Sequence, residues 1–220
     1  MRLLLIRHAE SQGNVERRLQ GRREFPLTER GLCQAEALAE RLLSLPLSAL
    51  YSSPVGRAME TAEVIAAKAC LRVIAEPRLQ EYDFGDAVSG LTWQEIRERQ
   101  PAIIQAFRQG GPDFPSYPGE EGRDHFQARV REVMRHIAER HKGDENIAVI
   151  THAGPITLFL FDVLDREYQR PIPFVLDNAS ITTVEVKNGA GSHVPPVVIT
   201  GINDACHVSQ IQSEDRAGGI

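Results

Sequence analysis

The sequence predicts an α/β fold in which helices cover both faces of a mostly parallel β-sheet, a three-layer αβα sandwich. Two observations support this fold class. Short, wholly apolar runs such as residues 3–6 are typical of strands buried on both faces of a parallel sheet. These runs alternate with longer segments in which apolar residues recur at helical spacing, and that βαβ alternation is typical of α/β proteins.

The first part of the chain contributes three strands and two helices to this pattern. A helix is expected from Thr28 to just before Pro46, a residue that a helix does not accommodate in its interior. Its predicted apolar face consists of Leu32, Ala35, Leu38, Ala39 and Leu42. The other expected elements are strands at 3–6, 49–52 and 71–75 and a helix at 56–69.

The second part continues the alternation after a region of loops. Thr92 and Glu95 have the spacing of a capping box, which predicts a helix that runs toward a break near Pro101. Residues 110–122 hold three prolines and four glycines and are expected to form a loop. The remaining expected elements are helices at 123–141 and 155–164 and strands at 147–151, 181–186 and 197–200. We expect one domain over residues 1–212 and a disordered tail over 213–220.

Composition restricts the partners that this chain can have. The protein has 220 residues, of which 42% are hydrophobic and 25% charged, and its formal net charge is −5. An acidic chain does not favour nucleic acid or an anionic membrane as the main partner, because both attract basic surfaces. The apolar opening MRLLLI is too short for a signal peptide or a membrane span. A cytoplasmic location is therefore expected.

The three cysteines are Cys33, Cys70 and Cys206. They are widely spaced and include no CxxC pair, so no disulfide framework or metal site is predicted from them. We expect buried, reduced thiols.

Two histidines and two arginines occupy the positions where an α/β sheet binds ligands. Arg7 and His8 come directly after the first strand, and His152 follows the strand at 147–151. Arg57 lies at the start of the helix that follows the second strand. Ligands of open α/β sheets bind beyond the carboxyl ends of the strands, so we expect these side chains to share a site.

The motifs around these residues resemble those of a known family, the phosphoglycerate mutase-like branch of the histidine phosphatase superfamily. The resemblance covers nearly the whole chain and rests on six segments in the family's order: RHAES, QGRREFPLTERG, SSPVGRAMETA, EYDFG, LTWQEI and THAG. Together these segments are far more specific than any one of them alone. The resemblance implies a phosphoglycerate mutase-like fold and an enzyme that transfers phosphoryl groups.

The resemblance also implies roles for individual residues. It makes His8 the nucleophile that forms phosphohistidine and Glu81 the general acid. Phosphate is expected to bind Arg7, Arg57 and His152, together with Asn14, Gln20, Arg22 and Ala153. Glu121 is a rival for the proton donor, although its loop is better interpreted as a substrate lid. Substrate selection is expected to depend on Arg22, Arg23 and the loop at 110–122.

These roles are chemically coherent. The transition state of phosphoryl transfer spreads charge over three oxygens, so an enzyme mainly positions and neutralises the group, which the planar forks of Arg7 and Arg57 can do. Positive charge nearby also disfavours the imidazolium form and keeps His8 nucleophilic. A phosphate beside Glu81 would repel its ionised form and keep the acid protonated.

The sequence departs from the family pattern at three places. Ala153 follows His152 where the acid phosphatases and phytases have an aspartate, which disfavours that branch. The segment GDAVSGLT is one residue longer than usual and lacks a tryptophan and a glutamate. The usual Glu-Ser pair of the later loop is Glu121 and Gly122 here, so a hydroxyl is missing.

Three functions remain open on the sequence alone. The favoured one is a metal-independent phosphomonoesterase, without cofactor, that acts on a small phosphorylated metabolite. The substrate could be phosphoserine, phosphoglycerate, a sugar phosphate or α-ribazole phosphate. The alternatives are a 2,3-bisphosphoglycerate-dependent mutase and a weak phospho-ligand-binding module. No metal site is predicted, since no His, Asp and Glu cluster has ligand spacing. A homodimer is left open.

Overall fold

The computed structural model describes residues 1–109, 116–168, 172–187 and 197–212. Six strands were found: β1 (Arg2–Arg7), β2 (Leu47–Ser52), β3 (Val73–Ala75), β4 (Asn146–Thr151), β5 (Ile181–Val186) and β6 (Val197–Asp204). The α-helices are α1 (Gln12–Val15), α2 (Glu29–Leu43), α3 (Gly56–Ala69), α4 (Trp93–Arg99), α5 (Pro101–Gln109), α6 (Arg123–Arg140), α7 (Ala153–Val163) and α8 (Ser209–Gln212). Two 3₁₀ turns complete the set, η1 (Pro77–Leu79) and η2 (Cys206–Val208).

The six strands form one mixed sheet in the order β3-β2-β4-β1-β5-β6. Strands β3, β2, β4 and β1 are parallel to one another, whereas β5 runs antiparallel to both β1 and β6. The prediction of a mostly parallel sheet is therefore confirmed. Because β1 lies beside β4, the residues that follow these two strands emerge next to each other.

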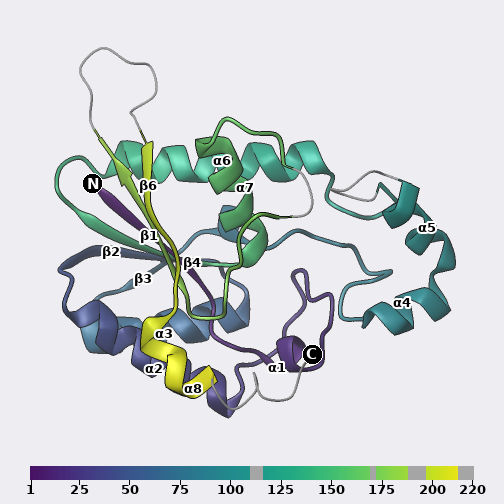
Figure 1. Cartoon of the computed structure of the whole chain (residues 1–220), viewed down its shortest axis with the longest axis horizontal. Helices are drawn as coiled ribbons and strands as arrows, with labels where there is room; N and C mark the ends of the chain where they lie inside the picture. Colours follow the sequence, from purple (N-terminus) through teal and green to yellow (C-terminus); the bar gives the residue numbers. More distant parts are fainter. Residues whose placement is uncertain (110–115, 169–171, 188–196, 213–220) are drawn as a thin grey trace.

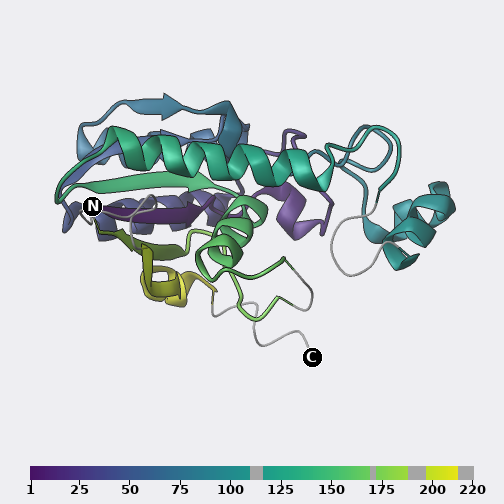
Figure 2. The same cartoon turned by 90° about the horizontal axis from the view of Figure 1, so that it is seen from above.

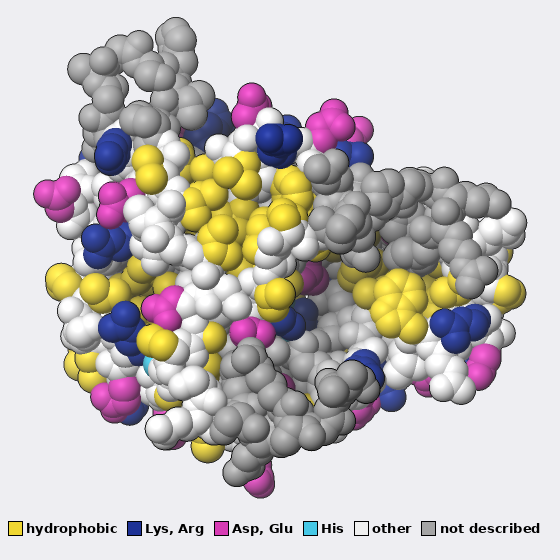
Figure 3. All heavy atoms as spheres, in the orientation of Figure 1, with side chains coloured by type: hydrophobic (Ala, Val, Ile, Leu, Met, Phe, Trp, Pro, Cys, Tyr) yellow, Lys and Arg dark blue, Asp and Glu magenta, His cyan; other side chains and the backbone are white. Residues whose placement is uncertain are grey.

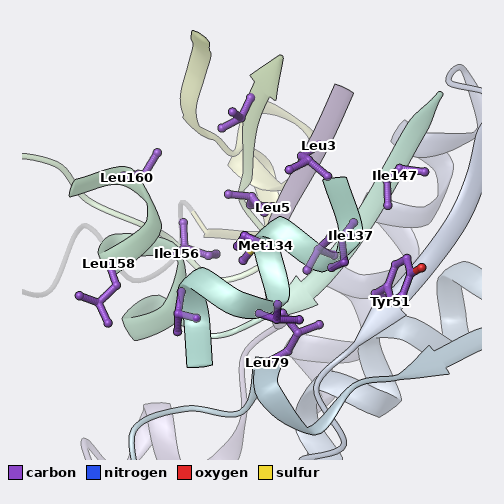
Figure 4. Packing of buried hydrophobic residues seen from close by; sticks show 14 of the residues in the cluster. Leu3, Leu5, Tyr51, Leu79, Met134, Ile137, Ile147, Ile156, Leu158 and Leu160 are labelled. Carbon is purple, nitrogen blue, oxygen red and sulfur yellow. The ribbon is translucent and has the colours of Figure 1, made fainter. Parts of the chain in front are cut away.

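Helices cover both faces of this sheet, as the three-layer prediction requires (Figure 1). Alternate residues of β1 supply the two cores, because successive side chains of a strand point to opposite faces. Leu3 and Leu5 pack in the core beneath α6 and α7, which Figure 4 shows from close by. Leu4 and Ile6 pack in the core against α2 and α3.

A smaller unit stands beside these layers. Helices α4 and α5 project from the end of the molecule where α6 begins (Figure 2). They share a separate apolar cluster that includes Val88, Ile96 and Tyr117. The predicted capping box is present, since the Thr92 hydroxyl accepts the Glu95 N–H and the Glu95 carboxylate accepts the Thr92 N–H. The predicted break falls between α4 and α5, at Pro101.

Some sequence predictions need correction. Strand β3 begins at Val73 and not at residue 71, because the Leu71 N–H bonds to the Ala66 carbonyl and closes α3 behind a left-handed Cys70. Strand β6 extends to Asp204 rather than ending at 200. Leu32 is 45% exposed, because the first turn of α2 faces the segment after β1 through its neighbour Gly31, where a Cβ would lie 2.0 Å from the Glu10 carbonyl oxygen.

The cysteines were also predicted wrongly. Cys33, Cys70 and Cys206 are free thiols and all three are exposed, since they lie on the outer side of α2, at the end of α3 and in η2. The loop at 110–122 falls partly, and the tail at 213–220 wholly, outside the described residues. In the described part of the chain, no helix has the length and apolar character needed to cross a membrane.

Candidate active site

The strand ends bring the predicted histidines together. Arg7 pairs with Thr151 at the last register position of β1 and β4, so His8 and His152 follow on adjacent strands. The His8 N–H donates to the Thr151 carbonyl at 2.9 Å, and the centroids of the two imidazole rings are 5.2 Å apart.

His8 is held with one nitrogen available for chemistry. Its side chain is buried, and Nδ1 lies 2.7 Å from the Ala9 carbonyl, which requires Nδ1 to carry the proton. Nε2 is then the nitrogen that keeps its lone pair, and this lone pair accepts a hydrogen bond from Arg57 Nε at 3.1 Å. Burial, followed by the charges of Arg57 and Arg7, holds the pKa of His8 well below its ordinary value of 6.5. The ring is therefore neutral at physiological pH.

His152 is fully buried and lies behind this pair. Arg57 Nη2 is 3.1 Å from His152 Nδ1, so Nδ1 accepts and Nε2 carries the proton that is donated to Ser53 Oγ at 2.9 Å. Burial and the charge of Arg57 lower the pKa of His152 well below 6.5 as well. Both histidines are thus neutral acceptors of the same guanidinium.

Arg57 organises the site as well as carrying charge. It occupies the first turn of α3, is 1% exposed, and also donates to the carbonyls of Gly21 at 2.7 Å and Arg23 at 3.0 Å. Together with the bonds to His8 and His152, these bonds use four of the five N–H groups of Arg57 and leave one on Nη1. Burial lowers the pKa of Arg57 to about 10, so the guanidinium stays charged.

Arg7 has more donors to spare. Its Nη1 donates to the Leu176 carbonyl at 2.5 Å, while its Nε is buried without a hydrogen-bond partner in the described part of the chain. An unsatisfied buried donor costs free energy, and an anion beside Arg7 would remove that cost.

Glu81 completes the group from the segment after η1. Its carboxylate accepts the N–H groups of Tyr82 at 2.8 Å and Gly154 at 3.1 Å. Burial raises the pKa of Glu81 above its ordinary value, although the Gly154 N–H and the charge of Arg57 act in the opposite direction. A Cβ at position 154 would lie 2.1 Å from Glu81 Oε1, so the glycine of THAG allows this approach.

Arg7, His8, Arg57 and Glu81 border a cavity of about 280 Å³, whereas the predicted phosphate ligand His152 is fully buried behind them and does not line this cavity. Of the predicted residues, it is lined by Arg7, His8, Asn14, Gln20, Arg57, Glu81 and Ala153. The wall is aromatic and aliphatic, with Tyr82, Phe84, Phe126, Tyr168 and Ile172. Figure 3 shows the molecular face seen in Figure 1, which is hollowed between the main body and the part formed by α4 and α5.

Two of the predicted binding residues lie close to the nucleophile's loop. The Asn14 side-chain oxygen accepts hydrogen bonds from Ser11, and Asn178 connects Asn14 with the His8 carbonyl. Gln20 Oε1 lies 2.9 Å from the Ser11 hydroxyl and is the alternative acceptor of its single proton. Asn14 and Gln20 therefore help to shape the loop that carries His8.

Arg22 does not line the cavity, in contrast to the prediction. Its guanidinium is paired with Glu121 at 3.0 Å and Asp83 at 3.5 Å, which turns it toward the loop at 116–122. Arg23 contributes its carbonyl to Arg57, while its side chain reaches the exposed Asp86.

Glu121 is bound as an anion and does not line the cavity. Its side chain is buried and pairs with Arg129 through both oxygens, with Nη2 to Oε2 at 2.8 Å, and also accepts the Asp83 N–H at 3.1 Å. Burial acts to raise its pKa, but the bonds and charge of Arg129 outweigh burial and lower it. Glu121 is thus a poorer proton donor than Glu81.

Arg129 is the important residue that sequence reasoning missed. It is buried on α6 and donates to the carbonyls of Arg78, Gln80 and Glu81, so it fixes the segment that presents the Glu81 carboxyl. A signal for it was available, because a lone arginine between Phe126 and Val130 falls within the apolar stripe of a helix. A buried arginine must be paired, and this one pairs with backbone oxygens and Glu121.

The site can bind an anion between two guanidinium groups, attack it with a neutral imidazole and supply a proton from a carboxyl group. The described residues contain one group of three metal-ligating side chains, Asp204, Cys206 and His207, which lies outside the cavity.

Comparison with known proteins places the chain among relatives with related chemistry. The family model described as histidine phosphatase superfamily (branch 1) matches residues 3–194, which confirms the resemblance inferred from the motifs. A probable phosphoglycerate mutase of Proteus mirabilis is 44% identical, with 98% of both chains covered. A metal-independent phosphoserine phosphatase of Arabidopsis thaliana is 34% identical over 95% of this chain and 84% of its own. The solved structure of YhfR from Bacillus stearothermophilus has a TM-score of 0.81 at 31% identity, covering 93% of this chain and 98% of the other.

Proposed function

The chain belongs to the histidine phosphatase superfamily and is an enzyme of the phosphatase type. On this premise we propose that it is a metal-independent phosphomonoesterase that acts on small phosphorylated metabolites. The observation that carries the proposal is the neutral, buried His8, whose Nε2 lies 3.1 Å from Arg57 Nε at the edge of a cavity that also holds Arg7 and Glu81. The proposed location is the cytoplasm.

The first step is attack of His8 Nε2 on the phosphorus atom, and for this its lone pair must exchange the hydrogen bond from Arg57 Nε for the bond to phosphorus. The phosphoryl oxygens accept hydrogen bonds from the Nε–H of Arg7 and the unused Nη1–H of Arg57. The two guanidinium groups thereby neutralise the charge that the transition state spreads over these oxygens. The N–P bond forms while the bond between phosphorus and the ester oxygen breaks. The Ala9 carbonyl stabilises the positive charge that develops on the ring, because it accepts the Nδ1 proton.

Glu81 supplies the proton that the leaving alkoxide requires. Its raised pKa keeps a fraction of the carboxyl protonated, and an approaching phosphate increases that fraction. In the second step water attacks phosphohistidine, the Glu81 carboxylate accepts the water proton, and orthophosphate leaves with His8 restored.

The cavity wall supports hydrolysis of a monoester with an uncharged part. The third cation that lines the cavity, Arg18, is bound by Glu16 and Glu95 and donates to the Gly90 carbonyl at 2.8 Å. A mutase must hold a phosphoglycerate carboxylate in addition to two phosphoryl groups. An aromatic wall binds these anionic groups less well than further cationic side chains would.

The mutase remains a second candidate because of one comparison. The Proteus mirabilis relative at 44% identity is described as a probable phosphoglycerate mutase. A mutase would convert 3-phosphoglycerate to 2-phosphoglycerate in the presence of 2,3-bisphosphoglycerate, whereas the proposed phosphatase releases orthophosphate from its substrate without a bisphosphate.

The test is a release assay on a panel of phosphomonoesters that includes phosphoserine, 3-phosphoglycerate, sugar phosphates and p-nitrophenyl phosphate, with and without EDTA. Orthophosphate release that survives EDTA supports the proposal, and it should disappear in His8→Ala but persist in the control His136→Ala, which changes an exposed histidine of α6. Labelled phosphate trapped on the enzyme should be acid-labile and alkali-stable. Isomerisation without net phosphate release would favour the mutase, and loss of turnover in EDTA that Mg²⁺ restores would overturn the proposal.

A further inference from the structure

Strand β6 ends beside α2, where the chain turns toward α8 (Figure 1). Three metal-ligating side chains lie close together at this turn. Asp204 is the last residue of β6, and Cys206 and His207 begin η2. A carboxylate oxygen, the thiol sulfur and a ring nitrogen of these residues all lie within 4.8 Å of one another. None of the three lines the cavity of the candidate active site.

His207 is held in the manner of a metal ligand. Its Nε2 lies 3.0 Å from the Ala179 carbonyl, which requires that nitrogen to donate its proton. Nδ1 then keeps its lone pair, and it is a buried atom with no hydrogen-bond partner in the described part of the chain. Metal-ligating histidines commonly have this arrangement, in which a backbone carbonyl fixes one nitrogen and leaves the other for the metal.

The turn itself is shaped around the other two ligands. The Cys206 N–H donates to Asp204 Oδ1 at 3.1 Å, which folds the carboxylate over η2. Asn203 precedes them with a φ of 57°, and its side chain donates to Asp177 Oδ2 at 3.0 Å. These bonds fix the backbone of the turn that carries Asp204 and Cys206.

The geometry points to a binding site for a thiophilic divalent cation, and we propose that Asp204, Cys206 and His207 bind Zn²⁺. Sulfur, nitrogen and oxygen donors together suit zinc, whereas Mg²⁺ and Ca²⁺ prefer oxygen alone. On binding, the Cys206 thiol releases its proton to solvent, the three side chains form the metal bonds, and water fills the fourth position. Tetrahedral bonds of about 2.0–2.3 Å separate ligand atoms by about 3.5 Å, so the exposed Cys206 side chain needs to move by roughly 1 Å.

One neighbouring cation competes with the metal. Arg41 of α2 lies with Nη2 3.6 Å from Asp204 Oδ2, and its side chain is 46% exposed. The guanidinium can therefore turn into solvent when a metal takes the carboxylate. Removal of this charge should tighten metal binding by about two- to five-fold, the range of a partly exposed ion pair.

Ala179 connects this site with the loop of the candidate nucleophile through hydrogen bonds on both of its sides. Ala179, whose carbonyl accepts from His207, donates its N–H to the carbonyls of Arg7 at 3.1 Å and His8 at 3.2 Å. Bound metal would hold this connection in place without touching the reacting atoms. We therefore expect Zn²⁺ to raise the melting temperature by mass action while turnover stays independent of it.

The experiment titrates the EDTA-stripped, reduced full-length protein with Zn²⁺ and, as a spectroscopic probe, Co²⁺. One equivalent per chain and a thiolate-to-cobalt charge-transfer band are expected. Cys206→Ser should abolish the band and weaken Zn²⁺ binding by about ten-fold or more, while the control Cys33→Ser keeps both. Arg41→Gln should strengthen binding, which a variant that merely unfolds cannot do.

Two results would overturn the site. One is the absence of stoichiometric Zn²⁺ uptake at micromolar concentration by a protein whose melting curve is normal. The other is uptake that Cys206→Ser and Cys33→Ser change equally. Because the readouts are binding and absorption, they are independent of whether the proposed phosphatase activity is found.

Discussion

Replacement of Glu81 by glutamine separates a proton donor from a residue that only shapes the cavity. The carboxyl group accepts two backbone N–H groups, from Tyr82 and Gly154. A glutamine has one acceptor oxygen and an NH₂ group, so one of these two N–H groups loses its acceptor. That loss costs about 1–3 kcal/mol of local stability, and it affects every substrate alike.

The loss of the acid acts differently on different leaving groups. General acid catalysis contributes about 10²–10⁴ to the rate when an alkoxide leaves, and little when the leaving group is p-nitrophenolate, which is stable without a proton. Glu81→Gln should therefore reduce kcat/KM on glycerol phosphate by roughly ten-fold or more beyond its effect on p-nitrophenyl phosphate. The ratio of the two losses cancels the shared cost of the unsatisfied N–H group.

The assay is steady-state phosphate release on both substrates by Glu81→Gln, with Glu121→Gln as the matched control. Glu121 is paired with Arg129 outside the cavity, so its replacement should reduce both rates by the same factor. Equal losses for Glu81→Gln would assign Glu81 to binding or structure. An unequal loss for Glu121→Gln would move the acid to that loop and refute the reasoning from the pKa directions.

The remaining predictions address the anion site, the pH dependence and the buried ion pair. Vanadate should inhibit the enzyme, and Arg57→Ala should weaken this inhibition, measured as an inhibition constant; an unchanged constant would remove Arg57 from the site. The pH profile of kcat/KM on an alkyl phosphate should fall on its acid side only well below 6.5, because the pKa of His8 is lowered, and on its alkaline side above 4.5, because that of Glu81 is raised. The alkaline limb should vanish in Glu81→Gln. Arg129→Met should lower the free energy of unfolding in urea by about 3–5 kcal/mol, because the backbone carbonyls of Arg78, Gln80 and Glu81 lose their donor and the buried Glu121 keeps Arg22 but loses its bidentate partner. Adding Glu121→Gln should recover part of that loss, and no recovery would contradict the argument.

Much of the fold could be predicted from the sequence because its signals are local. The run at 3–6 is wholly apolar, and the structure buries those residues on both faces of the sheet, two in each core. The capping box at Thr92 and the break at Pro101 depend on residues a few positions apart, so spacing was enough to find them. The predictions that Leu32 and the three cysteines are buried were wrong, since the structure exposes them. Burial depends on which distant segments of the chain cover a position.

The candidate site divides in the same way. By itself the sequence determined that His8, Arg57 and His152 follow strand ends, because residue order and strand boundaries decide which side chains meet at one edge of a parallel sheet. Only the tertiary structure decided how Glu81 and Glu121 differ. Their loops lie side by side, but Arg129 pairs with one carboxylate and holds only the backbone of the other. Charge pairing and desolvation act through space over a few ångströms, and residues far apart along the chain, such as Glu81 and Gly154, set these distances.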